Sequence, residues 1–312
     1  MQIVKYNTSD KKRWDKFVEN CKNGHFCFFR DFMEYHAQRF EDFSLLILDD
    51  NNSLLSILPA NIKSTTLYSH QGLTFGGLLI DDKMTTKTML DLFTVLKDFL
   101  KTNGIKKLVY KCIPYIYHTK PSEEDRYAFF RNDAKIIRRD VTSALDFTEE
   151  IKYSKGRKWT VNKASKNHLT FEQSYDLVSY WTLLEEVLKT HHKTKPTHSL
   201  NEIQKLSLLF PDNIKLFIAT QKNTLLAGAL IYEYKNIIYT QYLANSPEGR
   251  ECGALDFILD TLIKKVYFNK RYFNFGISNE NDGQFLNIGL IAQKEGFGAR
   301  AVVNDVYEME IL

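Results

Sequence analysis

The spacing of apolar residues along the chain alternates between short continuous runs and a period of three to four. Short runs bounded by Asn, Gly or Pro predict strands, and the longer period predicts amphipathic helices. In the first half the predicted strands cover residues 2–6, 43–50, 53–63, 105–114 and 141–147, and residues 66–80 supply a further strand with a loop. The predicted helices there cover residues 10–21, 30–39, 85–103 and 123–131.

The second half repeats this plan after a lysine-rich segment, residues 153–168, which we interpret as a helix near a domain junction. The strands predicted there cover residues 169–174, 214–220, 224–234, 236–244, 272–278 and 301–311. The helices cover residues 176–189, 200–209, 253–266 and 285–294. Ser199 and Glu202 have the spacing of a capping box for the helix that follows them. The two halves therefore read as one α+β unit used twice.

The length supports this division. A chain of 312 residues exceeds the size at which one hydrophobic core stops growing. We expect an N-terminal domain over residues 1–147 and a C-terminal domain over residues 148–312.

Composition narrows the class of protein. With 44% hydrophobic and 26% charged residues the chain has the balance of a globular protein. It has no apolar run long enough for a bilayer, and its N-terminus carries charges where a signal peptide needs an apolar stretch, so we expect a cytoplasmic protein. Cys21, Cys27, Cys112 and Cys252 are widely spaced, which favours reduced structural thiols over a zinc or dithiol site.

The net charge of +4 is spread along the chain. A DNA-binding protein normally concentrates its basic residues in one stripe, so we expect no DNA partner. A mildly positive site for a phosphorylated ligand is compatible with this charge.

The segment from residue 236 to residue 263 predicts a strand, a polar loop and a helix beginning near Gly253 and Ala254. Backbone N–H groups at a helix start attract phosphate, glycines let the main chain approach it, and Arg250 adds charge. We therefore name Gly249, Arg250, Gly253 and Ala254 as cofactor-binding candidates. The alternative is an ordinary turn, because such junctions are common.

Two segments carry a family resemblance. Arg250 and Gly253 fit the acyl-CoA loop of the GNAT (acyl-CoA N-acyltransferase) superfamily, although Leu255 stands where that pattern has a small residue. Residues 273–300, FNFGISNENDGQFLNIGLIAQKEGFGAR, resemble the tail of the Fem-like GNAT proteins, a group that includes bacterial surface-polysaccharide enzymes. The matching positions are Phe275, Gly276, Lys294, Gly296, Phe297 and Gly298. The segments LYSHQGLTFGGLL, YKCIPYIYH and PTHSLNEI also look like that group.

The resemblance implies two tandem GNAT-like units, each with a mixed, mainly antiparallel sheet flanked by helices. It further implies that one unit holds the acyl donor, that the acceptor lies in a cleft between the units, and that the last strand is shared with the first domain. The loop at Gly253 points to the second unit as the donor side. The activity implied is acyl-CoA-dependent transfer, of acetyl above all, to an amino sugar or sugar nucleotide in surface-polysaccharide synthesis.

Polar and aromatic residues near predicted strand ends are the acceptor-binding candidates. Aromatic faces stack on the C–H surface of a sugar, and hydroxyls and imidazoles bond its rim. Loops beyond strands are also common places for ligand contacts. The set is His70, Gln71, Lys111, Tyr115, Tyr117 and His118. Taken singly, each residue is better explained by packing or surface exposure, whereas the cluster as a whole favours a site.

Transfer from a thioester to an amine needs a base for the amine, a proton donor for the thiolate and support for the oxyanion. His198, His70 and Glu280 are the base candidates, and Tyr242 is the candidate proton donor. By resemblance, Lys294 corresponds to a lysine that stabilises developing negative charge in Fem-type enzymes. His191, His192 and His198 do not form a metal motif, because adjacent side chains on a helix diverge and no carboxylate completes the set.

Three other functions stay open. A Fem-type enzyme would take its aminoacyl group from tRNA, but residues 176–209 are interrupted by Pro196 and lack the heptads of a long helical arm, so tRNA is not the expected partner. A relative that binds acyl-CoA without catalysis is the second, and acylation of protein or amino-acid amines is the third. The acyl group, the acceptor and the oligomeric state do not follow from the sequence.

Overall fold

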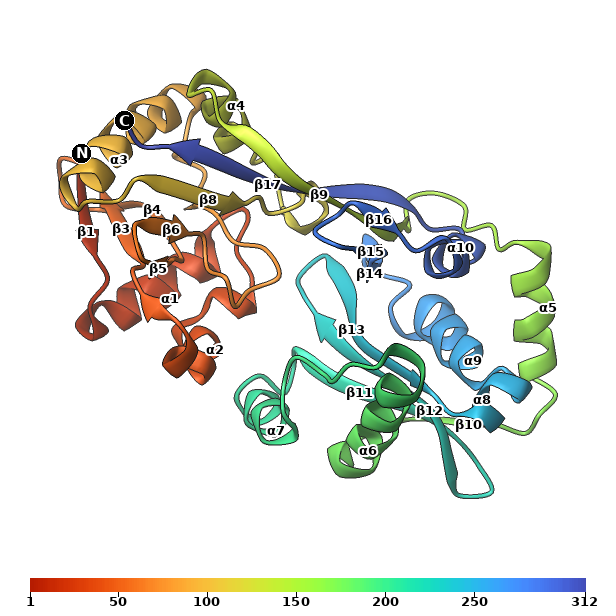
Figure 1. The fold of residues 1–312 in the computed structure, drawn as a ribbon. Coiled ribbons are helices and arrows are strands. Elements are labelled where there is room, and N and C mark those ends of the chain that lie inside the picture. Colours follow the sequence, from red (N-terminus) through yellow and green to blue (C-terminus); the bar gives the residue numbers. More distant parts are fainter. The chain divides into compact units, whose positions relative to one another are not determined.

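The computed structural model describes the backbone of all 312 residues and every side chain except those of residues 191 and 192. The chain forms two compact units (Figure 1). Unit 1 consists of residues 1–141, 279–285 and 303–312, and unit 2 consists of residues 142–278 and 286–302. Each unit is α+β, as the two-fold pattern of the sequence predicts.

Unit 1 contains two sheets. One has the order β1 (Gln2–Lys5), β3 (Leu45–Leu48), β4 (Leu54–Leu58) and β7 (Leu79–Ile80). The other runs from β17 (Arg300–Glu310) through β8 (Lys107–Lys111), β6 (Thr66–Tyr68) and β5 (Asn61–Lys63) to β2 (Glu41–Asp42). The helices of this unit include α1 (Lys11–Asn20), α2 (Arg30–Met33), α3 (Thr86–Thr102) and α4 (Glu124–Arg131).

Unit 2 is built on a single sheet. Its strand order is β10 (Thr170–Ser174), β11 (Ile214–Gln221), β12 (Thr224–Glu233), β13 (Ile237–Asn245), β14 (Tyr272–Ile277) and β9 (Lys135–Asp146). The helices are α5 (Lys155–Ala164), α6 (Leu177–Val187), α7 (Leu200–Leu209), α8 (Pro247–Cys252), α9 (Ala254–Thr261) and α10 (Ile288–Gly296).

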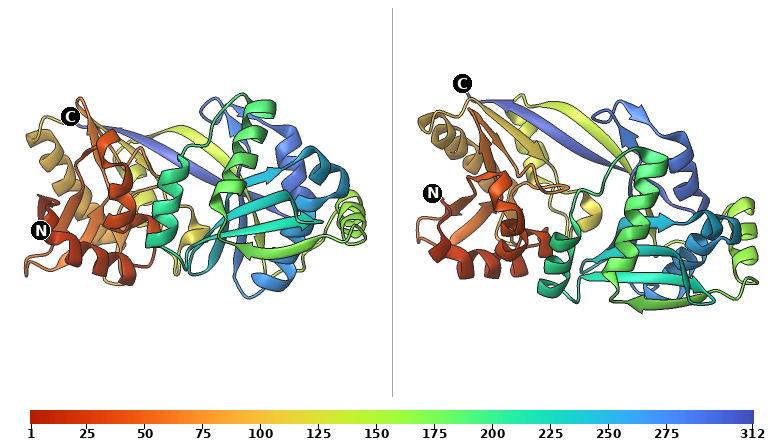
Figure 2. Two further views of the ribbon diagram at one scale, coloured as in Figure 1. Left: turned by 90° about the horizontal axis from the view of Figure 1, so that it is seen from below. Right: turned by 60° about the horizontal axis from the view of Figure 1, so that its bottom comes forward.

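Strand β12 explains why the sheet of unit 2 carries helices on both faces (Figures 1 and 2). Ala227, Ala229 and Ile231 belong to the hydrophobic core that includes the apolar face of α9. Gly228 faces the other way, where a Cβ atom would lie 2.5 Å from the ring of Tyr180 on α6. A strand covered on both faces needs apolar or small residues at every position, which is why TLLAGALIYE shows no alternation.

Each unit contains one parallel strand pair joined by a helical connection. In unit 1, β6 and β8 are parallel, with Thr66 opposite Lys107, and α3 connects them. In unit 2, β13 and β14 are parallel, with Ile237 opposite Tyr272, and α8 and α9 connect them. The sheet pairings that surround these two pairs are antiparallel. The two units therefore share this motif of a parallel pair within a mainly antiparallel sheet, and the hydrophobic pattern indicated the likeness of the two halves without any repeated residues.

The last strand of each half of the sequence pairs with a strand from the other half. β17, the last strand of the chain, pairs with β8 of unit 1, placing Val306 opposite Lys111. The end of β9, which closes the first half of the sequence, pairs with β14 of unit 2, placing Leu145 opposite Phe273. Two of the four unit boundaries accordingly fall inside these strands, after residues 141 and 302.

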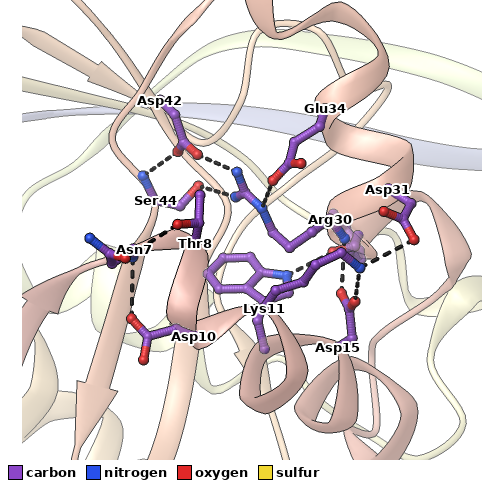
Figure 3. Close-up of polar contacts among 12 residues, drawn as sticks. Asn7, Thr8, Asp10, Lys11, Asp15, Arg30, Asp31, Glu34, Asp42 and Ser44 are labelled. Atoms are coloured by element: carbon purple, nitrogen blue, oxygen red, sulfur yellow. Dashed lines mark hydrogen bonds and ion pairs between the residues drawn. The ribbon is translucent and has the colours of Figure 1, made fainter.

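A buried arginine ties the first helices of unit 1 to its sheet (Figure 3). Arg30 is 3% exposed. Its guanidinium bonds Glu34, Asp42 and the hydroxyl of Ser44, and it stacks on the ring of Tyr6 at 3.8 Å. Two carboxylates and an aromatic face compensate its desolvation, so this cation has a structural role.

Some predicted elements differ in the structure. Residues 30–39 form only one α-helical turn, α2, followed by a 3₁₀ segment with non-helical angles at His36. Strand β9 begins at Lys135, six residues before the predicted strand. The polar loop expected after β13 is wrong, because Ser246 caps a short helix, α8, with Pro247 at its start. The capping box of Ser199 and Glu202 is confirmed. None of the helices, as far as the structure describes them, has the length and apolar composition needed to cross a membrane.

Candidate functional site

The parallel pair of unit 2 separates after a short common stretch. β13 and β14 are in register only from Ile237 and Tyr272 to Tyr239 and Asn274. β13 then passes through an irregularity, since Leu230 and Ile231 of β12 lie opposite Tyr242 and Thr240, and Gln241 is the extra residue. From residue 240 to residue 245 no strand among those described is registered on the β14 side of β13. Such a strand edge can pair with an extended ligand.

Two of the predicted catalytic residues are in contact. The Tyr242 hydroxyl accepts the backbone N–H of His198 at 3.2 Å and lies 2.7 Å from its Nδ1. The Trp181 ring packs edge-on against Tyr242 at 5.4 Å. Burial raises the pKa of Tyr242, so its hydroxyl stays protonated at neutral pH. His198 is held just before α7 by the cap at Ser199, and the irregularity in β13 sets the position of Tyr242.

Lys294 lies at the end of β14. Its Nζ on α10 donates to the carbonyl oxygens of Gly276 at 2.8 Å and Ile277 at 2.6 Å. Its side chain is buried, and desolvation lowers the pKa of the amine to about 7. Gly276 has a φ of +78°, which places its carbonyl at the turn that Lys294 reaches. Both the neutral amine and the charged ammonium are therefore accessible near physiological pH. The ammonium keeps a third N–H for another acceptor.

A polar cavity of about 240 Å³ lies where the end of β13 meets α5, α8, α9 and α10. Two of the predicted cofactor-binding residues, Arg250 and Gly253, line it. The other lining residues are Arg157, Trp159, Thr160, Lys163, Asn245, Glu251, Asp256 and Gln293. Arg157 pairs with Asp256, so that acid is already neutralised. Lys163 and Arg250 are in no ion pair that the described side chains make, which leaves the cavity with cationic groups for an anion.

The other two cofactor-binding candidates, Gly249 and Ala254, are buried in the core of unit 2. Ala254 is fully buried, and Gly249 is buried within α8. A Cβ at Gly249 would lie 2.4 Å from Oδ1 of Asn245 and 2.5 Å from the carbonyl oxygen of Leu226. Gly253 has a φ of +81°, and its Cβ would lie 3.2 Å from both Ala164 Cβ and the Thr160 carbonyl. Contact with β12 and α5 therefore accounts for both glycines without any ligand.

The acceptor candidates of unit 1 follow its own parallel pair. β6 and β8 end at the same edge of the sheet, and the loops beyond them are bonded to each other. The Ser69 hydroxyl accepts the N–H of Lys111 at 2.7 Å, and the N–H of Gly76 donates to the Lys111 carbonyl at 3.1 Å. Parallel strands bring loops from distant parts of the sequence together in this way.

His70, Gln71 and Lys111 meet in these loops. Nζ of Lys111 donates to the carbonyl of Leu73 at 2.5 Å and lies 3.3 Å from that of Gln71. Burial first, and the positive charge of Arg138 second, lower the pKa of Lys111 to about 8. His70 is 4% exposed and lies against the ring of His36 at 5.2 Å, and burial lowers its pKa to about 3. A histidine that is neutral and inside the packing is poorly placed as a solvent-accessible base.

Tyr115, Tyr117 and His118 form the loop after β8. Tyr115 is 51% exposed, whereas Tyr117 is buried against Phe75 at 4.4 Å. Nε2 of His118 lies 3.1 Å from the Ile113 carbonyl, and burial lowers its pKa to about 4. Packing therefore occupies Tyr117 and His118, and Tyr115 presents the accessible ring of this group.

Glu280 and the histidine segment fall outside these clusters. Glu280 is an exposed residue of β15 (Asn279–Glu280), in the short stretch of chain that groups with unit 1. The side chains of His191 and His192 lie outside the described residues. Among the side chains that the structure describes, no group of three or more His, Cys, Asp or Glu could hold a metal ion.

Helix α5 contains residues that the sequence reading did not assign to the site. Trp159 and Lys163 line the polar cavity although they precede Arg250 by about ninety residues. The exposed Trp159 within a basic helix was the available sequence signal, but only folding brings it to the end of β13.

A second cavity of about 680 Å³ lies in unit 2 between α6, α7, β10 and β11. Leu177, Leu208, Pro211, Leu216 and Leu230 contribute apolar lining, and Lys215 beside them is paired with Glu233. None of the predicted site residues lines it.

Comparison with known proteins gives the fold a name. No protein-family profile matches the sequence, and no curated protein is significantly similar to it. Among solved structures, FemX superposes with a TM-score of 0.67 at 12% identity, covering 98% of this chain and 97% of that one. The C-terminal domain of a putative lysylphosphatidylglycerol synthetase from Agrobacterium fabrum gives 0.61 at 12% identity, covering 97% and 92%. A tandem GNAT protein of the clavulanic acid biosynthesis pathway gives 0.55 at 10% identity, covering 100% and 98%.

The chain has the tandem GNAT, Fem-like fold. This statement covers both units, because each of these three structures matches nearly the whole chain. At such identities the likeness establishes the fold, while the chemistry has to come from the residues described above.

Proposed function

We propose that this protein is an N-acyltransferase that takes an acyl group, of which acetyl is the first choice, from coenzyme A. The observation that carries the proposal is the separation of β13 from β14, with the end of β13 leading into a cation-lined cavity. A coenzyme A thioester has an extended amide-bearing arm and a diphosphate. The free edge of β13 suits the arm, because main-chain groups without a strand partner can bond its amides.

The phosphates of the donor would lie in the polar cavity. Arg250 and Lys163 supply positive charge, and α9 begins at Ala254, directly after the lining residue Gly253. Cations and the first N–H groups of a helix both favour a phosphate. In this proposal Gly249 and Ala254 support the cavity from within the packing.

The chemistry would take place near the Tyr242 hydroxyl. Attack of a neutral amine on the thioester carbonyl forms a C–N bond, and collapse of the intermediate breaks the C–S bond. The amine loses a proton, for which His198 is our candidate acceptor, directly or through water. The departing thiolate gains a proton, for which Tyr242 is our candidate donor because its raised pKa keeps it protonated. Lys294 would support negative charge with its third N–H.

The acceptor in this proposal is an amino sugar or sugar nucleotide of surface-polysaccharide synthesis, bound by the loops after β6 and β8 in unit 1. The support is chemical. Tyr115 offers an accessible aromatic face on the loop after β8. Gln71 offers an exposed polar side chain on the loop after β6, where its carbonyl accepts from Nζ of Lys111. Glu280 is kept as an alternative base.

A second candidate is aminoacyl transfer from tRNA, and one observation favours it. FemX and the lysylphosphatidylglycerol synthetase domain superpose better than the tandem GNAT protein does. Against it, α6 and α7 have 11 and 10 residues, so residues 176–209 do not form a long helical arm. A relative that binds acyl-CoA without catalysis remains the third possibility.

The test combines a binding and a turnover experiment. Calorimetric titration with acetyl-CoA should give saturable binding, and incubation with a panel of amino sugars and nucleotide-linked amino sugars should release thiol and add one acetyl group to one of them. Arg250→Gln should raise the donor KM, whereas Arg271→Gln, on a basic residue outside the cavity, should not. Absence of acetyl-CoA binding, with transfer from a charged tRNA, would replace the first proposal by the second.

A further inference from the structure

The three tryptophans of this chain have very different environments. Trp14 and Trp181 are 0% and 2% exposed, respectively, whereas Trp159 is 64% exposed. Trp159 lies on α5 and lines the polar cavity together with Arg250 and Gly253. Single exposed aromatic residues are common on protein surfaces. What distinguishes Trp159 is that its exposed ring lines a polar cavity that also contains Lys163 and Arg250.

We propose that α5 forms an adenosine-binding site, in which Trp159 stacks on the base and Lys163 and Arg250 bind the phosphates attached to its ribose. The inference rests on the proposed function, because it assigns the nucleotide part of the donor to the same cavity. It goes further in naming α5, a helix outside the two parallel-strand motifs, as the recognition element.

The geometry of α5 supports this assignment. Lys163 follows Trp159 by four residues, so both side chains lie on one face of the helix. The Lys163 Nζ is 5.4 Å from the centroid of the indole ring. A ring with a cation held over it matches a nucleotide, which joins a planar base to an anionic phosphate. Stacking of a base on an aromatic side chain and cationic contact with phosphate are the usual components of such recognition.

Helix α5 is firmly held, which makes Trp159 a fixed platform. Its start is capped by the Ser154 hydroxyl, which accepts the N–H of Arg157 at 3.2 Å. The guanidinium of Arg157 pairs with Asp256 on α9, donates to the Gln293 carbonyl at 3.3 Å and stacks on the ring of Phe297 at 4.4 Å. A platform that is already ordered loses little conformational entropy on binding.

The cavity also contains polar atoms that lack a partner. Nε of Arg157 and Oδ1 of Asn245 are buried, and neither makes a hydrogen bond with any residue that the structure describes. Buried donors and acceptors are normally satisfied by protein, water or ligand. One donor and one acceptor beside an exposed indole suit a base that has both kinds of group. Glu251 is the unneutralised acid of the lining, and it leaves the two cations in excess.

Two possible acyl donors contain a phosphorylated adenosine. Coenzyme A contains adenosine with phosphates at its 3′ and 5′ positions, and tRNA ends in an adenosine with a 5′ phosphodiester. The shared ligand is a phosphorylated adenosine, and the site on α5 is proposed for that group.

The distribution of tryptophans provides a direct assay. Because Trp14 and Trp181 are buried, iodide should quench mainly the fluorescence of Trp159. Adenosine 3′,5′-bisphosphate should quench this emission saturably and protect it from iodide. By calorimetry Trp159→Ala should weaken binding about 5- to 150-fold, and Trp159→Phe should retain most of the affinity, because a stacked base contributes about 1–3 kcal/mol. The matched control is Phe268→Ala, an equally exposed aromatic of unit 2, which should bind normally.

Equal affinity of the wild-type protein and the Trp159→Ala variant would overturn the inference, and so would absence of protection from iodide. Coenzyme A and an RNA hairpin ending in CCA then distinguish the sources: the one whose binding depends on Trp159 is the donor. A transfer reaction whose donor KM is unchanged in Trp159→Ala would overturn this inference alone. Saturable binding that depends on Trp159, with no transfer to any amine, would overturn the proposed function and leave the adenosine site standing.

Discussion

The Tyr242 hydroxyl and the His198 imidazole form a hydrogen-bonded pair across 44 residues of sequence, with 2.7 Å between Oη and Nδ1. The backbone N–H of His198 donates to the same hydroxyl oxygen at 3.2 Å. Because the oxygen already accepts that N–H, the proton of the hydroxyl is available for Nδ1. The pair thus links a hydroxyl that stays protonated at neutral pH to Nδ1 of an imidazole.

Tyr242→Phe removes this proton while it preserves the ring that packs against Trp181. If Tyr242 protonates the leaving thiolate, kcat should fall about 10²-fold or more, with the donor KM little changed. Steady-state kinetics would measure both values. Tyr175→Phe, at an 88% exposed position, is the control and should behave as wild type. An unchanged kcat in Tyr242→Phe would remove this residue from the mechanism.

Lys294 should make stability depend on pH. Its pKa is lowered from 10.5 to about 7 in the folded protein, so between these values the unfolded chain holds a proton that the folded chain has released. The free energy of unfolding should therefore rise with pH across this window, by at most about 1.4 kcal/mol per pH unit. Below pH 7 the folded protein also holds the proton, so the full cost of burying the charged Lys294 is then present and no longer changes with pH.

Urea denaturation of wild type and Lys294→Met at several pH values isolates this contribution as a difference. Lys294→Met should lack the rise, and the exposed-site variant Lys166→Met should retain it. Parallel stability curves for wild type and Lys294→Met would show that the two carbonyl contacts compensate the burial of the charge.

Gly253 and Gly156 should respond to alanine in opposite directions. Gly253 has a φ of +81° and a crowded Cβ position, so Gly253→Ala should lower the free energy of unfolding by about 1–2 kcal/mol. Gly156 lies in α5 with no atom within 4 Å of a Cβ, so Gly156→Ala should raise it by about 0.4–1 kcal/mol. Equilibrium unfolding in urea checks both.

Asp305 on β17 should be important for the stability of unit 1. It is 1% exposed and accepts bonds from Arg126 at 3.0 Å and from Arg139 at 2.5 and 3.0 Å. Asp305→Ala should cost about 2–4 kcal/mol, less than a fully buried pair because Arg139 is half exposed. The comparison is Asp282→Ala, which removes an exposed partner of Arg138 and should cost about 0–1 kcal/mol. Thermal unfolding of the two variants would rank them, and equal losses would contradict the prediction.

Features determined by local sequence were predictable. The apolar stripe of Met89, Leu92, Phe93, Leu96 and Leu100 indicates α3, and these five side chains are the buried ones of that helix. The capping box of Ser199 and Glu202 needs only four consecutive residues. Helix periodicity and capping depend on residues within one or two turns, so their physical causes are present in the sequence.

For the candidate site, the sequence predicted which types of residue are present but not how they are arranged. A polar junction with Arg250 and Gly253 was visible, but α8 was not, because a six-residue helix has too little periodicity to show. Gly249 and Gly253 were expected to make room for a ligand, and the structure shows that their Cβ positions are taken by β12 and α5. A glycine indicates that another group approaches the backbone closely, and the sequence does not say whether that group is a ligand or another part of the chain.

By itself, the sequence determined that this chain forms two α+β units of one pattern, together with the strands and helices of local origin. Tertiary structure decided which strand completes which sheet, since β9 pairs with β14 and β17 with β8. It also decided that His198 meets Tyr242 and that Trp159 joins Arg250 at one cavity. These contacts join residues that lie from 44 to about 200 positions apart. Their free energy comes from burial and pairing that exist only after the chain has folded.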